Sequence, residues 1–320
     1  LVVADHAEGL GTMIELFKGN PQLLKDPTLK RWAELFDSGP AGAMEAYTEM
    51  NALTAENNLP AAMSDPGLAR TIWDDYVATA DQFNEPGRFT ALIGYEWTSL
   101  IKGNNLHRVL ILRGDKSKAD QIIPFTFIDS PDPEKLWEFM AAYEKNTGDY
   151  VLAIPHNGNL SNGMMFMPST ISGEAFDRAY AETRAKWEPV YEVTQIKGDG
   201  EAHPFLSPND EFAGYELWDQ GNLDMSQRKS DDMLQYEYAR EALKNGLLLE
   251  QRHGANPYKF GVVGSTDSHT ALAAVEEENF FGKATNAEPK PDRMGHAFAK
   301  TDKGEFRGDM LVSSGYAAVW

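Results

Sequence analysis

The feature of this sequence that most restricts its fold is the alternation of short apolar runs with longer amphipathic stretches. Several of the short runs are apolar almost throughout, as expected of strands that are covered on both faces. The predicted strands are Leu1–Ala4, Phe89–Trp97, Leu106–Leu112, Tyr150–Pro155, Val190–Ile196, Phe260–Ser265 and Tyr316–Trp320. Because strands that alternate with helices are typical of βα units around a parallel sheet, the sequence predicts an α/β fold.

The predicted helices between these strands have clear start and stop signals. Asp65-Pro66 and Asp132-Pro133 each place a capping side chain before a proline, which the first helical turn tolerates. Asn245-Gly246 is a typical helix end. The predicted helices are Gly67–Asn84, Lys135–Tyr143, Gly173–Trp187 and Ser230–Lys244, with two or three more over Gly11–Asn57.

The 320 residues contain no linker of low complexity and no repeat, which predicts one large domain over residues 1–320. Both ends lie inside apolar runs, at Leu1–Ala4 and Tyr316–Trp320. A natural chain rarely begins and ends within a strand, so we expect a fragment that lacks at least one N-terminal strand. A secretion signal would lie upstream of Leu1, which leaves a periplasmic and a cytoplasmic location both open.

Composition removes several kinds of function. The sequence has no cysteine, which excludes disulfides, thiolate nucleophiles and cysteine-ligated metal sites. Its 29 Lys+Arg and 49 Asp+Glu give a net charge of −20, which argues against a basic nucleic-acid groove. No apolar run is long enough to span a membrane. A small-molecule partner is expected, and the sequence does not indicate the oligomeric state.

Four of the seven histidines, His6, His107, His156 and His269, lie at the start or just past the end of a predicted strand. The carboxyl ends of parallel strands meet at one rim, where active sites are built. Neutral imidazoles with Asp and Glu are ligands that zinc, manganese and iron prefer. The residues at these positions are Asp5, His6, Glu96, His107, His156, Asp267 and His269. Asp267 and His269 point to the same side if their segment is extended.

Each of these residues also has a simpler interpretation. Asp5-His6 can be a helix cap with a surface histidine, and Thr266-Asp267-Ser268 can cap a helix over Thr270–Glu277. The recurrence of His or Glu at four strand ends favours a metal site over independent caps. His253 and His296 lie in polar sequence and are expected to be solvated.

The sequence resembles the PHP superfamily, named for polymerase and histidinol phosphatase, and within it the branch called domain of unknown function 3604. Five motifs in order carry this resemblance: Ala-Asp5-His6-Ala-Glu8, Gly94-Tyr95-Glu96-Trp97, Asn105-Leu106-His107-Arg108, Ile154-Pro155-His156-Asn157 and Gly264-Ser265-Thr266-Asp267-Ser268-His269. The resemblance implies a distorted (β/α)7 TIM-like barrel of the PHP type, which this fragment would hold without its N-terminal strand. It also implies two or three divalent metal ions, zinc, manganese or iron, at the carboxyl rim.

The ligands that the resemblance implies are His6, Glu96, His107, His156, Asp267 and His269, with Asp5 beside them. The sequence departs from the family pattern at two places. Ala4 stands where the family usually has Thr, and the first motif, His-x-His on the opening strand, is absent. The second departure agrees with a chain that begins after that strand.

These observations predict a metal-dependent hydrolase, in first place a phosphoesterase that uses a metal-bridged hydroxide at a di- or trinuclear site. Its substrate is expected to be a small anion. Arg108 is the candidate phosphate or carboxylate contact, with a surface ion pair as the alternative. Lys197 is a candidate cation at the rim, and His203 and Glu201 are candidate substrate or proton-transfer groups, with a solvated loop as the alternative. Asp5, Arg108, Lys197 and His203 are thus the candidate catalytic residues.

Two other functions stay open. An amidohydrolase or lactonase uses similar ligands and would cleave C–N or C–O bonds. A non-catalytic carbohydrate-binding or scaffold protein with a vestigial site would also suit the acidic composition and the 7 Trp, 12 Tyr and 16 Phe.

Overall fold

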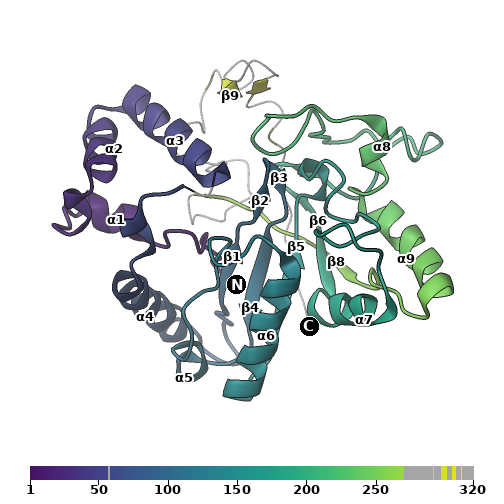
Figure 1. Ribbon diagram of the computed structural model, residues 1–320, viewed down its shortest axis with the longest axis horizontal. Coiled ribbons are helices and arrows are strands. Elements are labelled where there is room, and N and C mark those ends of the chain that lie inside the picture. The colour runs from purple at the N-terminus through teal and green to yellow at the C-terminus, as the bar shows by residue number, and fades with distance from the viewer. Residues whose placement is uncertain (57, 270–290, 292–296, 301–304, 308–310, 312–320) are drawn as a thin grey trace. The chain divides into compact units, whose positions relative to one another are not determined.

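The computed structural model describes residues 1–56, 58–269, 291, 297–300, 305–307 and 311 (Figure 1). The chain divides into two compact units. The first contains Leu1–Lys102 and Val109–Leu152, and the second contains Gly103–Arg108 and Ala153–Trp320. The predicted strand Tyr316–Trp320, the alternative helix Thr270–Glu277 and His296 lie outside the described residues. The single domain expected from the sequence stays a prediction.

The first unit is rich in helices, and aspartate side chains start several of them. Its helical segments are α1 (Thr12–Phe17), η1 (Leu23–Lys25), α2 (Pro27–Asp37), α3 (Pro40–Ala55), η2 (Ala61–Ser64), α4 (Pro66–Gln82), α5 (Lys116–Ala119) and α6 (Pro133–Thr147). Asp65 accepts a hydrogen bond from the Leu68 N–H (2.8 Å) and Asp132 from the Glu134 N–H (2.9 Å). The predicted caps of α4 and α6 are therefore confirmed, as are the helices over Gly11–Asn57.

The helices of the second unit differ from the predicted boundaries. They are η3 (Gly158–Leu160), α7 (Arg178–Trp187), α8 (Asp231–Leu234) and α9 (Ala239–His253). The predicted stop at Asn245-Gly246 is wrong, because α9 continues to Gly254, which ends it in the left-handed conformation (φ 77°). Gly246 has another role: the side chain of Asn256 packs where its Cβ would lie.

Five predicted strands are confirmed in shortened form: β1 (Ile93–Trp97), β4 (Arg108–Leu112), β5 (Val151–Pro155), β6 (Val190–Gln195) and β8 (Gly261–Gly264). The remaining strands are β2 (Leu100–Ile101), β3 (Asn104–Asn105), β7 (Gly198–Asp199), β9 (Ala297–Lys300) and β10 (Glu305–Arg307). One sheet has the order β1-β4-β5 and another the order β7-β6-β8, while β9 and β10 form an antiparallel pair.

The expected TIM-like barrel is wrong: across the described part of the chain the strands form small separate sheets and no closed barrel. The predicted opening strand Leu1–Ala4 forms no strand, although the Leu92 N–H donates to the Leu1 carbonyl (2.7 Å). In the second unit, β8 pairs parallel with β6, but the other edge of β6 is taken at its end by the antiparallel β7. A mixed α/β architecture remains.

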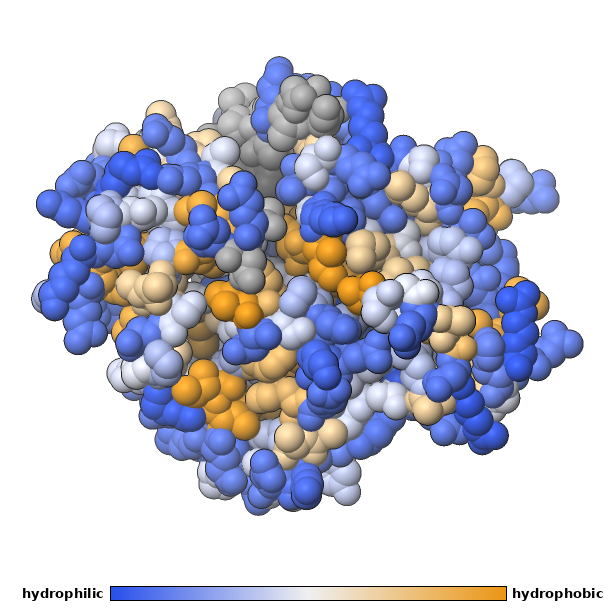
Figure 2. Space-filling view, in the orientation of Figure 1, coloured by the Kyte–Doolittle hydropathy of each residue, from blue (hydrophilic) through white to orange (hydrophobic). Residues whose placement is uncertain are grey.

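Each unit has its own apolar core. In the first unit, Trp32 is buried among residues of α1–α3, η1 and η2, namely Leu16, Leu23, Leu29, Ala46 and Met63. In the second, Phe166 is surrounded by aromatic rings, with ring centroids 5.0 Å from Tyr191 and 5.3 Å from Tyr258. Hydrophilic residues cover most of the face drawn in Figure 2, as a charge of −20 leads one to expect. Among the described helices, none has the length and apolar character needed to cross a bilayer.

Candidate metal centre

In the first unit, the segment that follows Leu1–Ala4 runs beside β1 and brings its acidic and imidazole groups to Glu96. The Glu96 N–H donates to the Asp5 carbonyl and the Ala7 N–H to the Glu96 carbonyl, both at 2.8 Å. His6 and Glu96 form a parallel β-bridge, and Nδ1 of His6 lies 3.9 Å from Oε1 of Glu96. Asp5, His6 and Glu96 are therefore neighbours, as the sequence predicts.

Carboxyl groups gather around His6. Burial raises the pKa of Asp5, and the nearby Glu96 charge raises it further, while His6 opposes the shift. Burial also raises the pKa of Glu8, although the Phe127 N–H donates to it at 2.7 Å. Oε2 of Glu8 is buried and has no hydrogen-bond partner among the described residues. Glu96 is buried, Glu8 is half-buried and Asp5 is exposed. Carboxyl groups in such proximity favour a bound cation, which would stabilise their ionised forms.

In the second unit, His107 and His156 form a buried imidazole pair. Their relative exposures are 4% and 2%, and their ring centroids lie 5.7 Å apart at 80°. A ring nitrogen of each lies within 4.8 Å of the other. Since zinc binds histidine nitrogen at about 2.0–2.1 Å, small rotations suffice to bring both rings to one ion.

The local sequence fixes both of these histidines. His107 directly precedes β4, and its N–H donates to the Asn105 side chain at 3.0 Å. His156 directly follows β5, and the next residue, Asn157, turns the chain with φ 51°. Glu96 in the first unit offers a buried carboxylate, and His107 and His156 in the second offer two buried imidazoles. Both are donor types that could hold a metal ion.

The third group of predicted residues also lies in the second unit. Lys197 forms a hydrogen-bonded ion pair with Asp267, and the side chains of both are 11% exposed. The backbone at Asp267 has φ 49°, so the segment to His269 is not extended, contrary to the expectation. His269 is exposed, and its Nδ1 lies 3.0 Å from the Asp267 carbonyl oxygen. The roles of Asp267 and His269 as ligands stay predictions.

Arg108 lies in the interior, away from any solvent-facing position. Its Nε is 3.0 Å from Oε1 of Glu188, while Nε of Arg184 is 3.1 Å from Oε2 of the same carboxylate. The Arg108 side chain is 1% exposed. Arg108 therefore forms an ion pair, as the alternative predicts, but the pair is buried and does not lie at the surface. This geometry gives no support to a phosphate contact.

His203 and Glu201 stabilise the loop that carries them. Nδ1 of His203 accepts a hydrogen bond from the Phe205 N–H (3.1 Å), so Nε2 carries the hydrogen of the neutral ring and donates to Asp219 (2.9 Å). Both ring nitrogens are thus engaged within the loop. Glu201 forms an ion pair with Arg240 at 2.6 Å. The roles of His203 and Glu201 in substrate binding or proton transfer, and the alternative of a solvated loop, stay predictions.

The sequence analysis did not predict a role for two residues that lie beside the candidate ligands. Thr98 follows the Glu96 motif, and its hydroxyl lies 2.6 Å from Nδ1 of His6. Glu8 belongs to the Asp5-His6 motif, and its carboxylate binds backbone N–H groups of Thr98 (3.4 Å) and Phe127 (2.7 Å). An acidic residue two positions after a candidate ligand was the one signal available for Glu8, whereas Thr98 had none.

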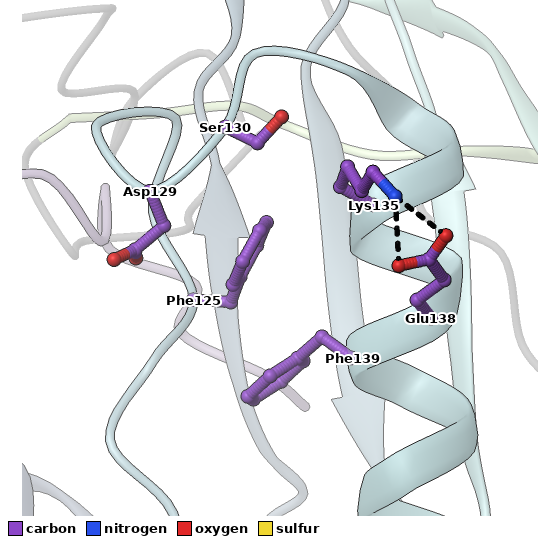
Figure 3. A pocket seen from close by; sticks show the side chains of 6 residues that line it. All are labelled: Phe125, Asp129, Ser130, Lys135, Glu138 and Phe139. Atoms are coloured by element: carbon purple, nitrogen blue, oxygen red, sulfur yellow. Dashed lines mark hydrogen bonds and ion pairs between the residues drawn. The ribbon is translucent and has the colours of Figure 1, made fainter.

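A surface cavity of about 490 Å³ lies elsewhere in the first unit, between α6 and the loop before it (Figure 3). Phe125 and Phe139 stack in it with centroids 5.2 Å apart, and Lys135 binds Glu138 at 2.8 Å. Asp129 and Ser130 complete its lining. No predicted site residue lines this cavity, so it is separate from the candidate ligands of the first unit.

Comparison with known proteins adds one finding. No curated protein and no solved structure matches the chain. A family model matches it from residue 1 to residue 320. The chain therefore belongs to the family described as protein of unknown function DUF3604.

Proposed function

We propose that this protein is a metal-dependent hydrolase. The observation that carries the proposal is the burial of Glu96, His107 and His156, which are 4%, 4% and 2% exposed. A divalent ion would stabilise a buried carboxylate in its ionised form and accept the lone pairs of neutral imidazole nitrogens. Their chemistry suits zinc, manganese or iron.

The proposed ligand set also includes His6, Asp267 and His269, which would allow two or three ions. His6 supports this by its place beside Glu96. The carboxylate of Asp267 is paired with Lys197, so Asp267 is proposed for its place in the sequence motif. The order of the five sequence motifs is our reason for proposing a relationship to the PHP superfamily.

A bound divalent ion would supply a Lewis acid and lower the pKa of water toward about 7. The chain's own groups would then bind the substrate and move protons. Asp5 lies next to His6, and it is the candidate carboxyl group that takes up a proton near the ligands. Lys197, beside Asp267, is the candidate cation for an anionic substrate group.

The favoured substrate is a phosphoester, because bound divalent ions and Lys197 would attract an anion despite the net charge of −20. One observation favours the second candidate, an amidohydrolase or lactonase. Arg108, the predicted phosphate contact, is engaged with Glu188 in the interior, which removes one expected anion-binding group.

Metal analysis of the purified full chain tests the first step. We expect at least one tightly held transition metal per chain and a lower melting temperature in chelator. Replacement of an outer partner of a metal ligand costs about 10–100-fold in affinity, so His107→Ala, His156→Ala and Glu96→Gln should each cost at least as much. His253→Ala is the matched control, since His253 lies at the end of α9 and belongs to no predicted site.

A panel of phosphomonoesters, phosphodiesters, carboxyl esters, lactones and amides then identifies the reaction. Phosphate release that depends on the added metal and is lost in His156→Ala supports the phosphoesterase. Turnover of lactones or amides without phosphate release would instead establish the second candidate. A metal-free chain with the same melting temperature in chelator would overturn both and leave a binding protein.

A further inference from the structure

We propose that Thr98 is a positioning residue for His6, and that Glu8 holds Thr98 in place. The inference rests on the proposed function, because it takes His6 as a metal ligand. Thr98 and Glu8 would act through His6 and would not bind the ion themselves.

The hydrogen bonds around Thr98 define the tautomer of His6. Nδ1 of His6 lies 2.6 Å from the Thr98 hydroxyl oxygen and 3.9 Å from Oε1 of Glu96. We assign the single hydrogen of the Thr98 hydroxyl to its contact with the Glu96 carbonyl oxygen at 3.4 Å. The Thr98 oxygen therefore accepts a hydrogen from Nδ1, and the carboxylate nearby also favours a hydrogen there. Nε2 is then the nitrogen that would bind a metal ion.

Such a partner matters for His6 because its side chain is 43% exposed. Packing restricts a ring with this exposure less than it restricts a buried ring, so a hydrogen bond contributes to its choice of rotamer. Metal-binding histidines generally donate their second N–H to an outer partner, which fixes both the tautomer and the direction of the ring. Thr98, itself 8% exposed, is placed to be that partner.

Glu8 fixes the position of Thr98. Its Oε1 accepts hydrogen bonds from the Thr98 N–H (3.4 Å) and the Phe127 N–H (2.7 Å). One carboxylate thus joins three segments of the first unit: the one that carries His6, the end of β1 and the loop before α6. Only Ala7 separates Glu8 from His6, so the same short segment provides both the proposed ligand and the group that orders its surroundings.

The experiment compares Thr98→Val with Thr98→Ser in the full chain. Valine keeps the shape but removes the hydroxyl, and serine restores it. Thr147→Val is the matched control, because Thr147 is also buried (7% exposed) and also uses its hydroxyl, which donates to the Tyr143 carbonyl at 2.7 Å. Glu8→Ala is the second test, and it should have the same effect as Thr98→Val in smaller measure.

Two readouts keep this inference separate from the proposed function. Nitrogen-15 NMR of the His6 ring in metal-free protein reports the tautomer, and we expect hydrogen on Nδ1 in the wild type and a mixture of tautomers in Thr98→Val. Competition with a chelator reports zinc or manganese affinity, which should fall about 10–100-fold in Thr98→Val and recover in Thr98→Ser.

A wild-type ring with its hydrogen on Nε2, or a Thr98→Val protein with unchanged tautomer and affinity, would overturn the inference. Should the wild type bind no metal at all, the proposed function fails, and the NMR comparison still decides whether Thr98 positions His6. Should Thr98→Val not fold, the wild-type spectrum and Glu8→Ala decide.

Discussion

The guanidinium of Arg108 and the carboxylate of Glu188 form a buried ion pair in the second unit, with Nε 3.0 Å from Oε1. Arg184 binds the other oxygen of Glu188 at 3.1 Å, so one carboxylate serves two cations. Glu188→Gln removes the charge that both guanidinium groups contact and should lower the free energy of unfolding by about 3–5 kcal/mol. Arg108→Met leaves one balanced pair and should cost less, about 1–3 kcal/mol.

Urea unfolding measures both changes. Arg113→Met is the control, because Arg113 is exposed at the end of β4 and should change stability by less than about 0.5 kcal/mol. If Arg108→Met kept full stability but raised KM for an anionic substrate, Arg108 would be a substrate contact as the sequence predicts.

Gly246→Ala should destabilise the protein, although Ala is the better helix former by about 1 kcal/mol. An added Cβ would meet the Asn256 side chain, whose oxygen accepts the Tyr258 N–H at 2.9 Å. Thermal unfolding of Gly246→Ala should therefore show a lower melting temperature. In an Asn256→Ala background the same change should be neutral or stabilising. A stabilising effect in the wild-type background would contradict the packing at Gly246.

Asp199 predicts a dependence of stability on pH. Burial raises its pKa from 3.8 to about 6, in spite of a hydrogen bond from the Glu201 N–H (2.9 Å). Because the folded-state pKa lies above the unfolded one, the folded state binds more protons between these values, and stability falls as the pH rises from about 4 to 6. Asp199→Asn should remove this loss and gain roughly 1 kcal/mol above pH 6, after allowance for partial exposure.

Asp210 serves as a control whose pKa is shifted in the opposite direction from that of Asp199. The hydrogen bond from Arg240 (2.7 Å) lowers the pKa of Asp210, so its contribution is present above the unfolded pKa and lost as the pH falls through the folded one. Asp210→Asn should therefore flatten the acid side of the stability profile. A difference between wild type and Asp199→Asn that stays constant from pH 4 to pH 7 would sink the assignment to Asp199.

Lys197→Met tests whether Asp267 is a ligand. The substitution leaves the Asp267 carboxylate, 11% exposed, without its cation, and should lower stability in chelator by about 1–3 kcal/mol. A bound metal ion would replace the lost charge, so the loss should be smaller when metal is present. Melting temperatures with and without metal measure the difference.

Lys229→Met is the matched control, since Lys229 and Glu237 form a buried pair that includes no candidate ligand. Its loss of stability should be the same in both conditions. An equal loss for Lys197→Met in metal and in chelator would show that Asp267 does not bind the ion.

Local signals in the sequence predicted local structure well. Asp132 before Pro133 identified the start of α6 because the cap depends only on residues next to it. The apolar run before His156 likewise identified β5, because a run of neighbouring apolar residues is a local signal for a buried strand. The end of α9 could not be predicted, because Gly246 looks like a helix end in the sequence. In the structure its missing side chain leaves room for Asn256, which lies beyond the helix.

Relations between distant parts of the chain were harder to predict. The prediction of a barrel was wrong because β-strand propensity does not determine which strands pair with each other. The antiparallel strand β7 pairs with one edge of β6. Arg108 was expected at an accessible rim, yet Glu188, 80 residues away, holds it in the interior. The neighbours of His6 were predicted through Asp5 and Glu96, whereas the role of Thr98 depends on a hydroxyl whose position only the fold supplies.

The tight connection between β6 and β7 has a consequence for related sequences. Gln195 pairs with Gly198, so only Ile196 and Lys197 form the loop of this hairpin. Insertion or deletion of one residue here would shift the register of β7 and turn Lys197 away from Asp267. Alignments of the family should therefore show a fixed spacing between the equivalents of Gln195 and Gly198, and variation in length should fall instead within the turn-rich segment around Phe212.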